Sequence, residues 1–290
     1  MAKEMRNIGA SVRARLLTMS KQTGQPFDVL MTRFVLERLL YRLSRSAYAR
    51  AFVLKGAMLL ATWEANPHRV TRDLDLLGFG ESESEGMLKI FGEVLAVADD
   101  DGVVFDLADL KVDQIREELA YGGLRLKTTA TLGGARVPVV VDIGFGDAIA
   151  PGLDDIEYPA LLDFPPPKIR AYARETVIAE KFQAMVMLGR ANSRMKDFHD
   201  IWVLSRNHAF DDDRLAQAIR ATFDRRKTEI PATTPDALTA DFANDPAKQQ
   251  QWRAFVEDVA SNPGPLVQVC ADLDGFLMPH ARRAIELAQR

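Results

Sequence analysis

An alternating pattern in the middle of the chain constrains the fold most. From residue 124 to 130, leucine, threonine and alanine alternate with arginine, lysine and threonine, and from 137 to 145 branched or aromatic residues fill every second position. Gly133-Gly134 lies between the two stretches, where a tight turn needs flexible residues. The pattern predicts a long β-hairpin with one buried face. Asp142 falls on the opposite face of its second strand.

Helical patterns flank the hairpin. Before it we expect helices at 8–22, 26–46 and 86–98, with a short strand at 52–54 and another strand at 71–76. Five prolines between 147 and 167 predict a linker. The remainder has helical periodicity, with helices expected at 174–189, 196–208, 211–224, 246–260 and 265–289.

A small mixed sheet between helical segments predicts an α+β fold. At 290 residues the chain is long enough for more than one domain. We expect an N-terminal helical segment at 1–50, a core domain at 51–165 and a helical C-terminal domain at 166–290.

Several classes of protein are excluded by missing motifs. The single cysteine, Cys270, rules out an internal disulfide and any multi-cysteine metal site. The four histidines lack zinc-protease spacing, and no P-loop, dinucleotide fingerprint or serine-hydrolase elbow occurs. The N-terminus has no apolar signal region, and no run of 18 apolar residues exists, so we expect a cytoplasmic protein.

Charge is distributed unevenly. The net charge is −4, yet residues 1–55 carry eleven lysines and arginines against three acidic residues. This basic segment is either a docking face for a phosphate backbone or an acidic partner, or an ordinary solvated helix surface.

Three aspartates are the strongest candidates for chemistry. Asp73 and Asp75 are two residues apart on an expected strand, so their carboxylates share a face, which is costly without a cation. Asp142 is the one carboxylate on a strand of valines. If the strands are neighbours, three carboxylates converge and can hold two Mg²⁺ ions for phosphoryl or nucleotidyl transfer. The alternatives are a chance acidic pair in a loop and an Asp142 that caps the turn of the following glycines.

Residues near the acidic pair are candidates for phosphate contacts. Lys55 and Gly56 lie between an expected strand and a helix, where backbone N–H groups can approach a phosphate; an ordinary turn is equally consistent. Arg69, Thr71 and Arg72 lead into the pair and either hold phosphates or neutralise the aspartates.

A second cluster is expected in the C-terminal half. Lys181 lies on an apolar helical stripe, where a lysine either extends to water or lines a pocket. Asp197 and Asp200 are one helical turn apart, and Lys196 is four residues before Asp200. From spacing alone, a surface salt bridge accounts for this second group.

Four segments together resemble the AbiEii/AbiGii toxin family of nucleotidyltransferase-like proteins. They are residues 55–60 with 69–77, residues 141–147, residues 175–185 and residues 192–200. The resemblance implies a polymerase-β-like nucleotidyltransferase core in the central domain. It also implies roles for individual residues: Asp73, Asp75 and Asp142 as metal ligands, Lys181 on the NTP phosphates, and Asp200, with Asp197, as an essential acid or base.

The expected function is transfer of nucleotides from an NTP to RNA with Mg²⁺, two ions being expected. As implied by the resemblance, the acceptor is the 3′ end of tRNA, the protein is the toxin of a bacterial toxin–antitoxin system, and its partner is a DNA-binding antitoxin encoded nearby. Two alternatives stay open. One is an inactive nucleotidyltransferase fold that only binds, and the other is an enzyme that nucleotidylates proteins.

Overall fold

The computed structural model describes residues 7–64, 71–80, 83–115, 122–257, 259 and 262–288. The chain divides into two compact units, each described by itself. The N-terminal unit comprises Met1–Gly146 and Asp155–Ala171, and the C-terminal unit comprises Asp147–Asp154 and Tyr172–Arg290. The division at 1–50, 51–165 and 166–290 stays a prediction.

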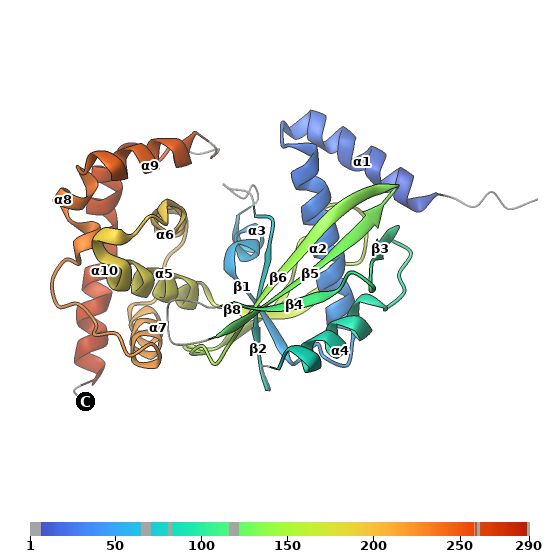
Figure 1. Ribbon diagram of the computed structural model, residues 1–290. Coiled ribbons are helices and arrows are strands. Elements are labelled where there is room, and N and C mark those ends of the chain that lie inside the picture. Colours follow the sequence, from blue (N-terminus) through green and yellow to red (C-terminus); the bar gives the residue numbers. More distant parts are fainter. Residues whose placement is uncertain are drawn as a thin grey trace, which may run out of the picture. The chain divides into compact units, whose positions relative to one another are not determined.

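The expected hairpin forms the centre of the N-terminal unit (Figure 1). Strands β5 (Gly123–Leu132) and β6 (Ala135–Phe145) pair antiparallel, and the side chains that alternate as predicted are buried on one face. Gly133 adopts φ 54°, and a Cβ there would lie 2.6 Å from the Gly9 carbonyl oxygen of the first helix. The turn therefore needs glycine both for its backbone and for this close approach.

The hairpin is part of a mixed parallel and antiparallel sheet. Across the described residues, neighbouring strands of this sheet follow the order β3-β5-β6-β2-β1-β8-β7, and β4 pairs with β5 as well. Strand β2 runs parallel to β6 and antiparallel to β1, which is parallel to β8. The other strands are β1 (Phe52–Lys55), β2 (Leu74–Gly78), β3 (Val103–Phe105), β4 (Lys111–Ile115), β7 (Leu153–Glu157) and β8 (Lys168–Tyr172). The parallel pair β2–β6 brings the two candidate acidic strands side by side.

The predicted linker at 147–167 is wrong in part. It contains β7, and β8 follows directly after Pro167. Prolines are tolerated beside strands when their missing N–H is not needed by the ladder. Strand β8 is only five residues long, so it shows no periodicity that distinguishes it from a helix start.

The expected N-terminal helices are confirmed. They are α1 (Ile8–Thr23), α2 (Phe27–Arg45) and α4 (Ser84–Leu95), with the short η1 (Gly56–Leu59) and α3 (Leu60–Trp63) after β1. Helix α2 packs against β6 and α4, and Phe34, Leu39 and Leu40 on it are fully buried. The core of this unit thus lies between α2 and the apolar face of the sheet (Figure 1).

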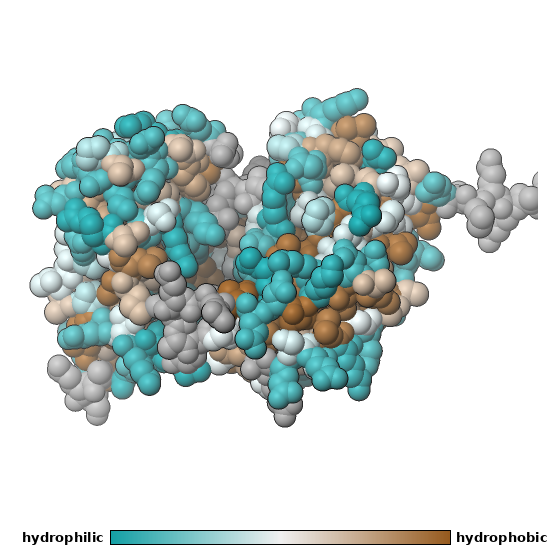
Figure 2. Space-filling model, viewed as in Figure 1, coloured by the Kyte–Doolittle hydropathy of each residue, from teal (hydrophilic) through white to brown (hydrophobic). Residues whose placement is uncertain are grey.

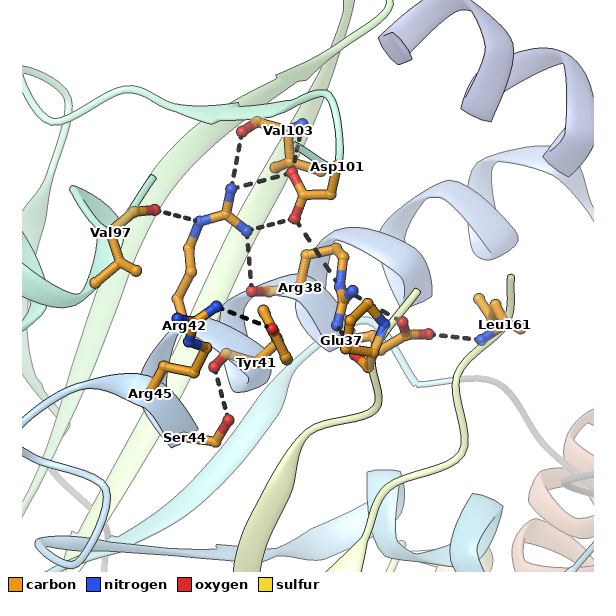
Figure 3. Close-up of polar contacts among 11 residues, drawn as sticks. Glu37, Arg38, Tyr41, Arg42, Ser44, Arg45, Val97, Asp101, Val103 and Leu161 are labelled. Carbon is orange, nitrogen blue, oxygen red and sulfur yellow. Dashed lines mark hydrogen bonds and ion pairs between the residues drawn. The ribbon is translucent and has the colours of Figure 1, made fainter. Parts of the chain in front are cut away.

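Two arginines of the basic segment are not on the surface. Arg42 forms a two-pronged ion pair with Asp101, at 2.6 and 3.0 Å, and both side chains are buried (Figure 3). Arg38, fully buried, lies over the Tyr41 ring at 4.4 Å. Burial raises the pKa of the neighbouring Glu37 to about 7. The network also bonds the backbone at Val97, Val103, Leu161 and Pro165.

We expect Asp101→Asn to destabilise the protein by about 3–5 kcal/mol, because it leaves Arg42 buried without its counter-charge. The matched control is Asp28→Asn, which removes the exposed Arg72–Asp28 pair and should cost within about 1 kcal/mol. Urea unfolding of the two variants measures the difference. Equal losses in both would show that the buried pair contributes no more than a surface pair.

The C-terminal unit is helical, as expected. Helix α7 packs against both α5 and α10, and α6 packs on α10 and α9. The elements are α5 (Arg174–Leu188), η2 (Gly189–Ala191), α6 (Met195–Asn207), α7 (Asp212–Arg225), η3 (Asp236–Leu238), α8 (Ala240–Ala243), α9 (Pro246–Val256) and α10 (Leu266–Ala288). Hydrophilic side chains cover most of the visible surface of these helices (Figure 2). No helix in the described part of the chain combines the length and apolarity that a membrane span needs.

Candidate functional site

The three predicted aspartates come together around the parallel strands β2 and β6. Asp75 on β2 is paired in register with Asp142 on β6, and Asp73 immediately precedes β2. Each carboxylate offers an oxygen within 4.8 Å of those of the other two, and all three residues are partly exposed. Because Asp142 lies inside a strand, the alternative that it caps a turn is wrong.

Gly56 makes room for this cluster. It adopts φ 71°, and a Cβ at this position would lie 2.0 Å from Asp75 Oδ2 and 2.6 Å from its Cγ. The carboxylate of Asp75 therefore occupies the space that any other residue at position 56 would fill. Gly56, expected near phosphate, is thus also needed for the position of the Asp75 carboxylate.

Two of the other residues predicted to contact phosphate, Lys55 and Thr71, lie beside the acidic cluster. Lys55 on β1 lies opposite Asp75 in the antiparallel register. Thr71 donates a hydrogen bond to Asp73 Oδ1 at 2.6 Å and so orients that carboxylate. Arg72 pairs at the surface with Asp28 at 2.8 Å. Arg69 lies outside the described residues.

Sequence reasoning missed one member of the site. Arg125 on β5 donates from Nε and Nη2 to both oxygens of Asp142, at 2.7 and 2.6 Å. These hydrogen bonds, together with the charges of the three aspartates, raise the pKa of Arg125. The alternation along β5 already placed Arg125 on the polar face, but only the strand register shows which carboxylate it meets.

The carboxylate cluster fits divalent metal. Mg²⁺ prefers carboxylate oxygens at about 2.1 Å, so oxygens on opposite sides of one ion lie about 4.2 Å apart. The three aspartates each place a carboxylate oxygen within 4.8 Å of the others, which is close to this spacing, and the Asp75 carboxylate fits there because Gly56 has no Cβ. The residues therefore suit one ion, or two that share a carboxylate.

The C-terminal unit holds the second predicted cluster. Lys181 Nζ on α5 lies 2.6 Å from Asp197 and 2.9 Å from Asp200, both on α6. Asp200 is fully buried and Asp197 nearly so. The surface salt bridge inferred from spacing is therefore wrong, because Asp200 pairs with Lys181 inside the unit.

Replacing Lys181 with methionine should destabilise the protein by about 3–5 kcal/mol, because two buried carboxylates lose their cation. Lys127→Met is the matched control, since it removes an exposed pair with Asp113 and should cost within about 1 kcal/mol. Thermal and urea unfolding provide the comparison. A loss for Lys181→Met no greater than that of the control would mean that the buried cluster tolerates an unpaired charge.

A further polar group on α5 was not predicted. Arg226 lies 3.3 Å from Glu180 and 3.5 Å from Asp147, and the Tyr172 hydroxyl donates to Asp147 at 3.4 Å. Burial is the main cause that raises the pKa of Tyr172, so this residue stays a neutral donor. The group joins α5 to the segment after β6 and to the end of α7, beside Lys181.

Three solved structures share the fold of this chain, and two of them are described as nucleotidyltransferases. A Helicobacter pylori protein described as a nucleotidyltransferase is 16% identical, with a TM-score of 0.52 over 91% of this chain and 99% of that one. MenT4, a nucleotidyltransferase toxin from Mycobacterium tuberculosis, is 20% identical, with a TM-score of 0.53 over 95% and 97%. JHP933 from Helicobacter pylori is 15% identical, with a TM-score of 0.51 over 90% and 95%.

These likenesses and the acidic cluster define the class as a nucleotidyltransferase fold. The family model described as "Nucleotidyl transferase AbiEii toxin, Type IV TA system" matches residues 38–279, and the chain belongs to this family. It is therefore a nucleotidyltransferase toxin of a type IV toxin–antitoxin system, which implies an antitoxin partner. No curated protein is similar enough in sequence to match the chain.

Proposed function

We propose that the protein transfers nucleotides from an NTP to RNA in a Mg²⁺-dependent reaction, with the 3′ end of tRNA as acceptor. The observation that carries this proposal is the triad of Asp73, Asp75 and Asp142, which the adjacent strands β2 and β6 bring together and in which Gly56 leaves room for the Asp75 carboxylate. Family membership supports the reaction class.

In the proposed reaction, the acceptor hydroxyl oxygen attacks the α-phosphorus of the NTP and pyrophosphate leaves. Asp73, Asp75 and Asp142 would hold the metal, which when bound neutralises negative charge on the phosphates. Asp142 accepts the proton of the attacking hydroxyl. Thr71 fixes the orientation of the Asp73 carboxylate through its hydrogen bond.

For the remaining candidates we propose the roles that the family motifs suggest. Lys181 neutralises charge on the pyrophosphate, and Asp197 and Asp200 hold its ammonium group in place. Lys55 and the backbone at Gly56 contact phosphate, together with Arg69 and Thr71. These assignments rest on residue type and local geometry within each unit.

RNA binding is proposed for the exposed basic residues of the N-terminal segment. Arg38 and Arg42 do not contribute, because they are buried. Arg13 and Lys21 on α1 are exposed, which leaves a smaller basic surface than composition suggests. Binding that depends on such residues weakens steeply with salt.

The test incubates purified protein with Mg²⁺, each α-labelled NTP in turn and total bacterial tRNA, with Asp73→Asn alongside. Label on tRNA with one NTP, absent from the variant, supports the proposal and identifies the donor. Label on protein instead would favour a protein-nucleotidylating enzyme. No incorporation with any NTP, in the presence of nucleotide binding, would favour a module that only binds.

A further inference from the structure

The ion pair between Arg125 and Asp142 places a positive charge inside the proposed metal site. We propose that Arg125 is an internal counter-ion that occupies Asp142 in the metal-free protein and must withdraw before divalent metal binds there with full strength. This inference rests on the proposed function, because it assumes that the three aspartates bind metal.

The strand register fixes Arg125 in this position. Asp142 on β6 is directly opposite Arg125 on one side and directly opposite Asp75 on the other. The guanidinium and the two carboxylates therefore form a row across three neighbouring strands. The register therefore places the backbone of Arg125 beside that of Asp142.

Geometry also explains why Arg125 competes with a metal ion. Its two N–H groups reach both Asp142 oxygens at 2.7 and 2.6 Å, which is the two-pronged arrangement that suits a carboxylate. A divalent cation needs one of the same oxygens. It would also lie next to a guanidinium of like charge, which weakens its binding.

A second observation indicates that the pair can open. The side chains of Arg125 and Asp142 are 42% and 20% exposed, unlike the sealed Arg42–Asp101 pair at 3% and 0%. An exposed guanidinium can turn into solvent without the desolvation cost that holds a buried one. The pair therefore offsets part of the negative charge of the three carboxylates before metal binds, and it can still open.

The experiment titrates Mn²⁺ into the full-length protein and measures free Mn²⁺ by electron paramagnetic resonance, without nucleotide. Arg125→Gln should bind Mn²⁺ at least about tenfold more tightly than wild type, because the competing charge is gone. Arg125→Lys should be intermediate, since a lysine keeps the charge but cannot reach both oxygens. Lys127→Gln, two residues along on the same strand face and paired with Asp113, should leave the affinity unchanged.

The outcomes separate this inference from the proposed function. Mn²⁺ binding that Asp73→Asn removes, with equal or weaker affinity in Arg125→Gln, would overturn the inference and leave the metal site standing. Absence of Asp73-dependent binding in both wild type and Arg125→Gln would overturn both. If Arg125→Gln does not fold, the Mn²⁺ affinity of Arg125→Lys is the deciding measurement. An affinity equal to that of wild type would contradict competition between Arg125 and the metal ion.

Discussion

Asp75→Asn should reduce nucleotide transfer by at least about 1,000-fold, equivalent to about 4 kcal/mol of transition-state stabilisation. Asp75 lies at the centre of the site, between Lys55 on β1 and Asp142 on β6. Asparagine keeps the shape of the side chain but removes the charge that holds a cation against the phosphates. The measurement is single-turnover incorporation of labelled nucleotide.

The control for this prediction is Asp113→Asn. Asp113 is also an aspartate on a strand of the sheet. It lies on β4, and it pairs with the exposed Lys127 on β5. Its replacement should leave transfer within about twofold of wild type, since a surface ion pair contributes little. Activity in Asp75→Asn close to that of the control would remove Asp75 from the proposed site.

Gly56→Ala should reduce transfer by about 100-fold or more while the protein stays folded. A methyl group at position 56 would overlap the Asp75 carboxylate, whose Oδ2 would lie 2.0 Å from it, so Asp75 must move out of the triad. A displacement of about 1 Å in a catalytic group is sufficient for a loss of this size. Initial rates and the urea midpoint are measured on the same preparation.

Gly24→Ala is the matched control for backbone strain. Gly24 has φ 73°, close to the 71° of Gly56, but a Cβ at Gly24 meets nothing within 4 Å. Both variants should lose about 1 kcal/mol of stability from the left-handed backbone, and only Gly56→Ala should lose activity. Full activity in Gly56→Ala would mean that the exact position of the Asp75 carboxylate does not matter.

Much of the N-terminal unit was accessible to sequence analysis because its signals are local. The alternation around Gly133-Gly134 predicted the hairpin and the face on which Asp142 lies. The spacing of Asp73 and Asp75 predicted a shared face, and the structure places these carboxylates beside Asp142. Most of the predicted helices are also found at close to their expected bounds.

Features that depend on pairing between distant segments were not accessible. Strands β7 and β8 are short and lie beside prolines, so a linker was the natural interpretation. Arg125 gave no signal of its own, because its partner is set by register rather than by spacing. Arg38 and Arg42 were counted as surface charge, although inside the unit Arg42 pairs with Asp101, about sixty residues away, and Arg38 lies near Glu37 and Asp101.

The most direct test of the metal-site account is anomalous diffraction from crystals grown with Mn²⁺ and a non-hydrolysable NTP. We expect an anomalous peak about 2.1 Å from oxygens of Asp73 and Asp75, with the nucleotide phosphates bound to the same ion. An NTP bound elsewhere, with no peak at these aspartates, would show that this acidic triad is not the site of nucleotide transfer.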